Sequence, residues 1–199
     1  MKVCVCGGTN PAANPKWHAV ADDLGHLLVA NKFEMVWGGN AFGLLSHVHQ
    51  KYIDKKKIST VVLPEAYIAD AVDEDKNNYD DITGDKIVRT DLVVERTHQM
   101  LLMANAVVIA PGGIGTVYEF WTAVEGKRAG EYNIDIILLN YNGFYDFQLK
   151  HFDFINQNGF TKIGEGGAPY KMQPEDLFHV ATTAEECITL LQKIRKKRS

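Results

Sequence analysis

A short apolar run that ends in a pair of glycines occurs three times in this chain. The runs cover residues 2–6, 33–37 and 106–110, and the pairs are Gly7-Gly8, Gly38-Gly39 and, after one proline, Gly112-Gly113. Segments with helical spacing of apolar residues follow each pair. Apolar strands that alternate with helices predict a parallel sheet covered on both faces. Right-handed crossovers then give an α/β, Rossmann-like doubly wound, mostly parallel sheet with helices on both faces.

The rest of the sequence continues this alternation, and its length suits a single domain over residues 1–199. Further strands are expected at 58–63 and 134–139, and a short strand is expected within 87–94. Helices are expected at 15–30, 42–53, 95–104, 147–157 and 183–196. The polar, aspartate-rich stretch 64–86 between two of these elements predicts a loop.

The most informative segment is AVVIAPGGIGTVYEF, residues 106–120. Its pattern is a buried strand, a glycine turn and a helix that we expect to open at Thr116. Glycines let the backbone come close to an anion, and the unpaired N–H groups of a first helical turn point at it. Because parallel strands all end at one edge of the sheet, the glycine turns should form one phosphate-binding crevice. The residues expected there are Gly7, Gly8, Gly38, Gly39, Gly112, Gly113, Gly115 and Thr116.

Glu119 in this segment has two interpretations. Thr116 and Glu119 fit T-x-x-E, a capping box in which both side chains satisfy the helix N-terminus. The alternative is a reactive acid, since a site that only binds phosphate gains nothing from a negative charge. The glycine turn is neither a Walker loop, because no lysine precedes Thr116, nor the G-x-G-x-x-G pattern of dinucleotide binding.

Composition excludes several classes of function. The net charge of −4 gives no overall electrostatic case for nucleic acid. No run approaches the ~18 apolar residues of a membrane span, and the N-terminus lacks the shape of a signal peptide. Three cysteines and seven histidines show no metal or redox spacing. We therefore expect a cytoplasmic protein with reduced, buried thiols, no metal and no cofactor.

The segment Pro111 to Glu119 matches P-G-G-x-G-T-x-x-E, the signature of the LOG (Lonely Guy) family. The chain resembles that family over most of its length, also at 3–8, 37–40 and 142–146. Members are cytokinin riboside 5′-monophosphate phosphoribohydrolases, often labelled possible lysine decarboxylases. The resemblance implies cleavage of the N-glycosidic bond of a purine-type nucleoside 5′-monophosphate, with cytokinin riboside or adenosine as the nucleoside. The products would be free base and ribose 5-phosphate, and the enzyme would be a homodimer.

The resemblance also implies roles for single residues. Arg96 corresponds to the catalytic arginine, which would hold the Glu119 carboxylate, contact the ribose or phosphate, or assist the leaving base. Glu119 would stabilise the ribose cation or activate water. Asn40 belongs to the second glycine segment of the substrate site, and Met100 would line the base pocket. The chain departs from the family pattern at four positions, which leave the preferred base open: Thr97, Glu125, Gly126 and Arg128.

Two other functions remain open from the sequence. One is a binding or carrier protein on the same fold, which holds a nucleotide or a molybdenum cofactor without hydrolysis. The other is the amino-acid decarboxylase of the older family label. That chemistry usually needs pyridoxal phosphate on a lysine, and no lysine here stands in a recognisable cofactor motif.

Overall fold

The computed structural model describes residues 1–11, 13–39, 42–65, 86–161 and 176–198. These residues form a seven-stranded sheet in the order β4-β3-β2-β1-β5-β6-β7, and every neighbouring pair is parallel. The predicted α/β, Rossmann-like fold is confirmed. The strands are β1 (Lys2–Cys6), β2 (Glu34–Trp37), β3 (Thr60–Pro64), β4 (Lys86–Thr90), β5 (Ala106–Ile109), β6 (Asp135–Leu139) and β7 (His179–Ala181).

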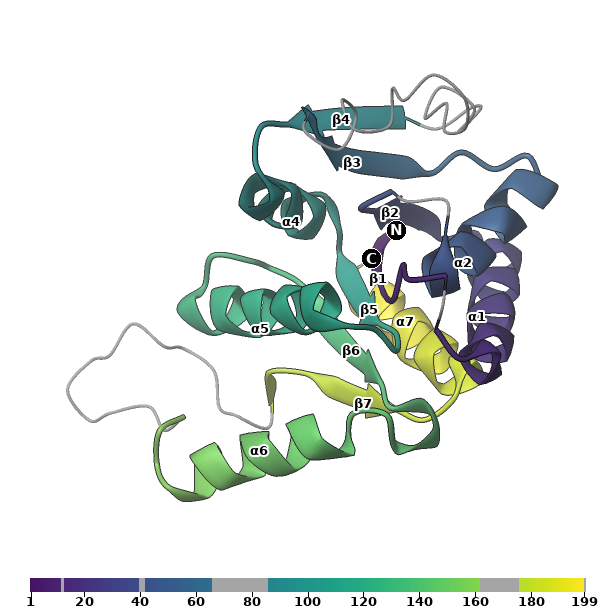
Figure 1. Ribbon diagram of the computed structural model, residues 1–199. Helices are drawn as coiled ribbons and strands as arrows, with labels where there is room; N and C mark the ends of the chain where they lie inside the picture. The colour runs from purple at the N-terminus through teal and green to yellow at the C-terminus, as the bar shows by residue number, and fades with distance from the viewer. Residues whose placement is uncertain (12, 40–41, 66–85, 162–175, 199) are drawn as a thin grey trace.

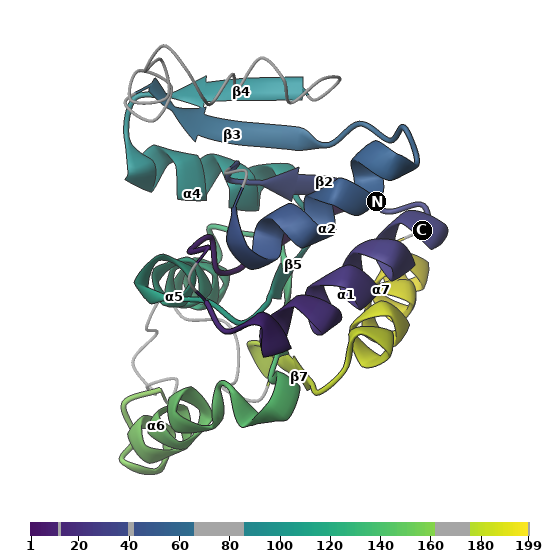
Figure 2. The ribbon, with the colours of Figure 1, turned by 45° about the vertical axis from the view of Figure 1, so that its right-hand side comes forward.

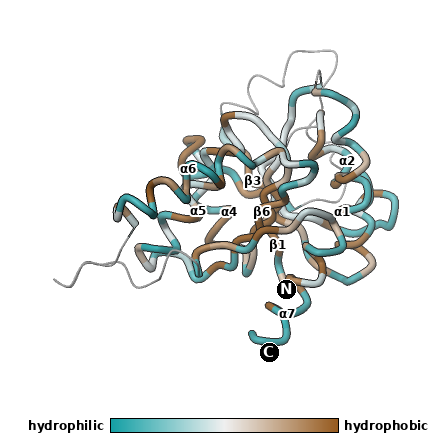
Figure 3. The backbone as a smooth tube through the Cα atoms, turned by 90° about the horizontal axis from the view of Figure 1, so that it is seen from below, coloured by the Kyte–Doolittle hydropathy of each residue, from teal (hydrophilic) through white to brown (hydrophobic). Residues whose placement is uncertain are grey.

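Helices cover both faces of this sheet, as Figures 1 and 2 show. One face carries α1 (His18–Ala30), α2 (Gly43–Asp54) and α7 (Ala184–Arg198), and the other carries α4 (Val93–Met103), α5 (Ile114–Ala129) and α6 (Asp146–Gln157). Short 3₁₀ helices, η1 (Pro15–Trp17) and η3 (Tyr141–Gly143), precede α1 and α6. The strands are the most hydrophobic part of the backbone (Figure 3).

The two faces bury alternate residues of each strand, because successive side chains of a strand point in opposite directions. In β1, Val3 and Val5 belong to the core beneath α1, α2 and α7. Cys4 and Cys6 belong to the core beneath α4, α5 and α6. All four side chains are at most 1% exposed, which explains why the central strands contain almost no polar residue.

The strand order reverses between β1 and β5. From β1 the chain proceeds outward through β2 and β3, whereas β5 begins the half that proceeds through β6 to β7. The helices after β1 and β5 therefore lie on opposite faces. Such a reversal opens a crevice at the carboxyl ends of the two strands, which is where doubly wound proteins bind ligands.

Several boundaries differ from the predicted ones. The short strand predicted within 87–94 is β4, which begins one residue earlier and ends at Thr90 because α4 already begins at Val93. The Glu95 carboxylate fixes this start by accepting the N–H groups of Asp91 and Leu92 at 3.0 and 3.1 Å. β7 was not predicted, since it has only three residues and two of them are exposed. Most of the predicted loop 64–86 lies outside the described residues.

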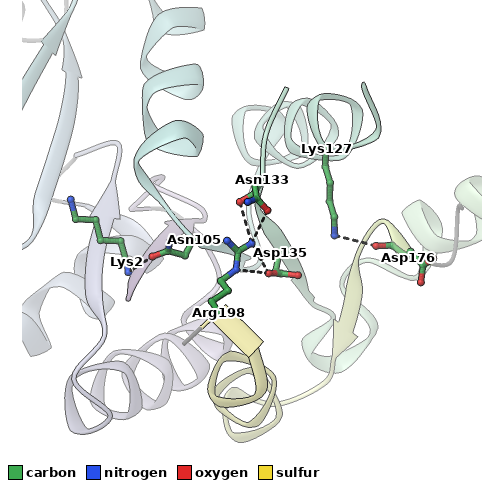
Figure 4. A network of polar contacts seen from close by, with 7 residues as sticks. All are labelled: Lys2, Asn105, Lys127, Asn133, Asp135, Asp176 and Arg198. Carbon is green, nitrogen blue, oxygen red and sulfur yellow. Dashed lines mark hydrogen bonds and ion pairs between the residues drawn. The ribbon is translucent and has the colours of Figure 1, made fainter. Parts of the chain in front are cut away.

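The amino ends of the strands are tied together by polar contacts (Figure 4). Arg198, at the end of α7, donates to the Asp135 carboxylate from Nη2 and Nε at 2.8 and 3.0 Å. The backbone N–H of Lys2 donates to Oδ1 of Asn105 at 2.9 Å. These contacts anchor the C-terminal helix to β6 and the start of β1 to the turn before β5.

Candidate active site

A cavity of about 680 Å³ opens at the carboxyl ends of the strands, at the reversal between β1 and β5. All predicted site residues in the described part of the chain line it. They are Gly7, Gly8, Gly38, Gly39, Arg96, Met100, Gly112, Gly113, Gly115, Thr116 and Glu119. Asn40 lies outside the described residues. The structure thus brings together turns that are far apart in sequence, while the roles of these residues remain predictions.

The turns after β1 and β5 touch each other through their backbones. The N–H of Gly8 donates to the carbonyl oxygen of Pro111 at 2.9 Å, and the carbonyl of Gly8 accepts from the N–H of Leu45 at 3.2 Å. A Cβ on Gly112 would lie 2.1 Å from Oγ1 of Thr116 and 2.8 Å from the nitrogen of Gly8. Glycine is required at residue 112 because no side chain fits between the two turns.

The N-terminus of α5 forms an open wall of the cavity. α5 begins at Ile114, earlier than predicted, and its N-cap is Gly113, which provides no side-chain cap. A Cβ built on Gly113 or Gly115 meets no atom within 4 Å. The backbone here can therefore be approached closely, and the N–H groups of the first turn are oriented as an anion site requires.

The capping-box interpretation of Thr116 and Glu119 is wrong. Thr116 lies inside the first turn of α5, and the helix has no side-chain hydrogen bond at its N-cap. The carboxylate of Glu119 instead lies 3.5 Å, through Oε1, from Nη2 of Arg96 on α4. The side chains of Arg96 and Glu119 are only 15% and 9% exposed. An ion pair with so little solvent around it interacts more strongly than a surface pair.

Burial has the largest effect on the pKa of Glu119. It disfavours the carboxylate and raises this pKa above the usual value of 4.5. The positive charge of Arg96 and a hydrogen bond from the Cys6 thiol oppose the effect, but the pKa remains raised. A carboxylate with this environment is a better proton acceptor than an exposed glutamate, which suits a group that must activate water.

Cys6 belongs to a buried layer behind the cavity that the sequence analysis did not connect with the site. Its Sγ lies 3.7 Å from Sγ of Cys4, and this contact together with burial raises the pKa of Cys6. The hydroxyl of Tyr145 donates to the carbonyl of Ala110, directly before the glycine turn, at 2.6 Å. The cysteines are free and buried, as predicted.

The positions that depart from the family pattern do not line the cavity. Glu125 and Arg128 pair with each other at 2.9 Å on α5, and Gly126 packs against the ring of Tyr132. Thr97 is buried and its hydroxyl donates to the carbonyl of Val93 at 3.4 Å. These four departures from the family pattern therefore do not alter the lining of the cavity in this chain.

One wall of the cavity contains no residue that the sequence assigned to the site. It is formed by residues that follow β1 and β6, and none belongs to a glycine motif: Asn10, Asn14, Trp17, His18 and Phe144. Trp17 and Phe144 contact each other edge to face, with ring centroids 5.1 Å apart. A sequence alone gives little signal for this wall, because its members come together only through the reversal of strand order.

Across residues 1–11, 13–39, 42–65, 86–161 and 176–198, no group of three or more histidine, cysteine or acidic side chains could hold a metal ion. Within the same ranges, none of the helices has the length and apolar character needed to cross a bilayer.

The sequence of this chain is similar to a known family and to several known proteins. A model of the family described as possible lysine decarboxylase matches residues 45–191. A probable cytokinin riboside 5′-monophosphate phosphoribohydrolase of Oryza sativa subsp. japonica is 29% identical to this chain. The aligned region covers 95% of this chain and 75% of the rice protein. A cytokinin riboside 5′-monophosphate phosphoribohydrolase of Arabidopsis thaliana is 26% identical, covering 80% and 72%.

Solved structures share the fold. The molybdenum cofactor binding protein of Rippkaea orientalis superimposes with a TM-score of 0.66 at 21% identity, covering 97% of this chain and 96% of that one. The Moco carrier protein of Chlamydomonas reinhardtii gives a TM-score of 0.65 at 18% identity, covering 98% of both chains. At these identities the likeness concerns the fold alone.

Proposed function

Because the chain belongs to the LOG family, which is described as possible lysine decarboxylase, we propose that it is a nucleoside 5′-monophosphate phosphoribohydrolase. It would hydrolyse the N-glycosidic bond of a purine-type nucleotide to free base and ribose 5-phosphate. The observation that carries the proposal is the position of the buried Arg96–Glu119 pair in the same cavity as the open N-terminus of α5. A phosphate site and a charged pair for chemistry thus share one cavity.

The phosphate lies in this proposal against the first turn of α5. Gly113 and Gly115 present backbone without side chains there, and the helix dipole favours a negative charge. Several charge-assisted hydrogen bonds, each contributing ~1.5–3 kcal/mol, would distinguish a nucleotide from a nucleoside. The first turn therefore fixes the 5′ end of the substrate.

Glu119 lies about one helical turn further along α5, where the ribose would follow the phosphate. Cleavage develops positive charge at C1′, as in other glycoside hydrolyses. The carboxylate can stabilise that charge and accept a proton from the attacking water. The hydroxide of this water becomes bonded to C1′, and the proton ends on the nitrogen of the departing base. Arg96 orients the carboxylate through the ion pair.

The base would lie against the apolar part of the cavity beside α4. Met100, one turn beyond Arg96 on α4, lines the cavity, and its side chain is almost completely buried. A thioether can pack against an aromatic ring without fixing its substituents. The geometry thus supports a purine and leaves the choice between adenine and a cytokinin base to experiment.

The proposal includes a homodimer. Leu92, Val94 and Leu102, at and within α4, are 57%, 55% and 51% exposed, and Ile114 at the cavity mouth is 92% exposed. Exposed large apolar side chains that form a contiguous patch are typical of surfaces that another protein covers. Sedimentation velocity at micromolar concentration tests this, and a monomer at all concentrations would contradict it.

The second candidate function is a binding or carrier protein, the kind of protein named for the molybdenum cofactor structures that share this fold. A carrier needs the phosphate site but no ionised acid beside the ribose. The two functions are separated by incubating the protein with adenosine and isopentenyladenosine 5′-monophosphates and following free base by chromatography. Release of base that disappears in Glu119→Gln supports the hydrolase. Tight binding of the monophosphates with no release of base would favour the carrier.

A further inference from the structure

The thiol of Cys6 lies behind the proposed catalytic acid and has no part in the reaction described so far. Cys6 is the last residue of β1, and the next residue, Gly7, lines the cavity. Its side chain is 1% exposed and belongs to the core beneath α4, α5 and α6. There it donates a hydrogen bond to the carboxylate of Glu119. A group on the central strand therefore contacts the acid from within the core.

The Cys6 thiol keeps its proton throughout the neutral pH range. The contact of its Sγ with Sγ of Cys4, at 3.7 Å, and burial raise the pKa of Cys6 well above its usual value of 9.0. An ionised carboxylate can only accept a hydrogen bond, and a protonated thiol has one hydrogen to donate. The bond between Cys6 and Glu119 is therefore directed from sulfur to oxygen whenever the acid is ionised.

The contact between Arg96 and Glu119 is too long to orient the carboxylate alone. Nη2 of Arg96 is 3.5 Å from Oε1 of Glu119, whereas charge-assisted N–H···O bonds are about 2.7–2.9 Å long. An ion pair at that distance attracts the carboxylate but leaves its rotation loosely defined. The thiol supplies a second donor from a different element. Arg96 reaches the carboxylate from α4 and Cys6 reaches it from β1, so the two together restrict its rotation.

The third titratable group near the carboxylate does not compete with the thiol. Among the described residues, the titratable groups whose charge or hydrogen bond reaches Glu119 are Arg96, Cys6 and Tyr145. The hydroxyl of Tyr145 donates to the carbonyl of Ala110 at 2.6 Å, so its hydrogen is already used. Burial, and then the nearby Cys6 and Glu119, raise the pKa of Tyr145, which stays neutral.

We propose that Cys6 is a positioning residue of the hydrolysis, whose thiol holds the Glu119 carboxylate in the orientation that faces the ribose. This rests on the proposed function for the role of the carboxylate. Cys6 does not line the cavity, so it acts through Glu119 and touches neither substrate nor water. A thiol suits this place because S–H is a weak donor, which orients a carboxylate and leaves it basic enough to accept a proton from water.

Steady-state release of base from adenosine 5′-monophosphate by Cys6→Ala tests the role. Loss of the donor should lower kcat by ~10-fold and leave KM unchanged, because the carboxylate turns while the phosphate site stays intact. The acidic limb of kcat/KM should move to higher pH, since the thiol lowers the pKa of Glu119. Cys6→Ser keeps a donor, so it should retain more of kcat and move the limb less.

Cys187→Ala is the matched control. Cys187 is also a free, fully buried thiol, but it lies on α7 in the core of the opposite face. Its loss removes the same atoms from a core without touching Glu119, and it should leave kcat, KM and the acidic limb as in the wild type. An acidic limb that stays in place in Cys6→Ala, or a kcat no lower than that of Cys187→Ala, would overturn the positioning role.

Infrared spectroscopy of the S–H stretching band decides the question should Cys6→Ala fail to fold, and it needs no substrate. A thiol that donates to a charged acceptor makes a stronger bond and absorbs at lower frequency. Glu119→Gln makes the acceptor neutral, so the Cys6 band, assigned by its loss in Cys6→Ser, should move to higher frequency while the Cys187 band stays. An unshifted Cys6 band overturns the inference.

The two proposals fail in different ways. Absence of base release by the wild-type protein would overturn the hydrolase, whereas a shifted Cys6 band would still support the hold of the thiol on Glu119. Base release with no effect of Cys6→Ala on kcat or on the acidic limb would overturn the role of Cys6 and leave the hydrolase standing.

Discussion

The guanidinium group of Arg96 lies against the backbone of Gly38, where β2 ends. A Cβ on Gly38 would be 3.3 Å from Nη1 of Arg96, closer than most real contacts of that kind, and 3.5 Å from Nε, an ordinary van der Waals distance. The catalytic arginine proposed here is therefore held between a glycine of one strand end and the carboxylate of Glu119 on α5. A glycine that the sequence assigns to phosphate binding also determines where the arginine can lie.

Gly38→Ala follows from this contact. The added methyl group should displace the guanidinium by a few tenths of an ångström and lengthen its 3.5 Å contact with Glu119. We expect kcat to fall by ~10-fold or more, since small misplacements of reacting groups are costly. The melting temperature should change by only a few degrees. Steady-state release of base, with thermal unfolding as the control, measures both, and a normal kcat would show that the position of Arg96 tolerates the shift.

Glu119→Gln tests the acid itself. The amide keeps the size of the side chain and removes its charge, so turnover should fall by ~10²-fold or more if the carboxylate acts on the cation or on water. Because burial raises the pKa of Glu119, its ionised form disfavours folding at neutral pH, and the variant should not melt earlier. Single-turnover kinetics and calorimetry supply the measurements. Unchanged turnover would remove Glu119 from the mechanism.

The pH profile should report the same carboxyl group. The active form is the carboxylate, and its pKa lies above 4.5, so kcat/KM should fall as the pH drops through that raised pKa. Arg96 lowers this pKa, and Arg96→Gln should therefore move the acidic limb to higher pH as well as slow turnover. Profiles for both proteins between pH 4 and 9 give the comparison. An acidic limb at the same pH in both proteins would show that the charge of Arg96 does not affect the pKa of the group that titrates.

Arg96→Lys distinguishes geometry from charge. A lysine keeps the positive charge but lacks the planar fork, so it should not restore activity. We expect Arg96→Ala and Arg96→Lys both to lower kcat and kcat/KM together, the pattern of an interaction made in the transition state. Initial rates over a range of substrate concentrations decide this. An effect on KM alone would assign Arg96 to substrate binding.

Two neighbouring glycines should respond in opposite ways. Gly115→Ala adds a methyl group that meets no protein atom and projects beside the proposed phosphate site. The melting temperature should hold or rise, since alanine is the better helix former by ~1 kcal/mol, while nucleotide affinity falls. Gly112→Ala places its Cβ 2.1 Å from Oγ1 of Thr116 and should cost ~1–3 kcal/mol of stability. Isothermal titration with nucleotide measures the affinity of both variants, and chemical unfolding measures their stability.

The sheet was readable from the sequence because its strands are buried on both faces. Continuous apolar runs such as Ala106–Ile109 leave little alternative, and every predicted strand exists. The strand that was missed, β7, consists of His179–Ala181, in which only Ala181 is buried. Burial that comes from one residue in three leaves no pattern to detect, and the strand forms because β6 offers it a parallel edge.

The candidate site was predictable where it is made of backbone and not where it is made of side chains. Gly7, Gly38 and Gly112 mark turns directly, because a glycine pair after an apolar run indicates a tight turn or a close backbone approach that other residues do not allow. Trp17 and Phe144 carry no such mark. They meet in the cavity because the turns after β1 and β6 end at the same edge, a relation set by strand order. The family resemblance singles out Arg96 and Glu119, but only the packing of α4 beside α5 shows that the two side chains meet.

The pairing of β1 with β5 has a consequence for how the chain is made. Val3 lies opposite Ala106, and the bond from Lys2 to Asn105 spans 103 residues. During synthesis the N-terminal half must wait with one edge of β1 unpaired until β5 leaves the ribosome. Such non-local pairing slows folding, and an open apolar edge invites association with other nascent chains. We therefore expect association between nascent chains to be strongest before residue 110 has left the ribosome.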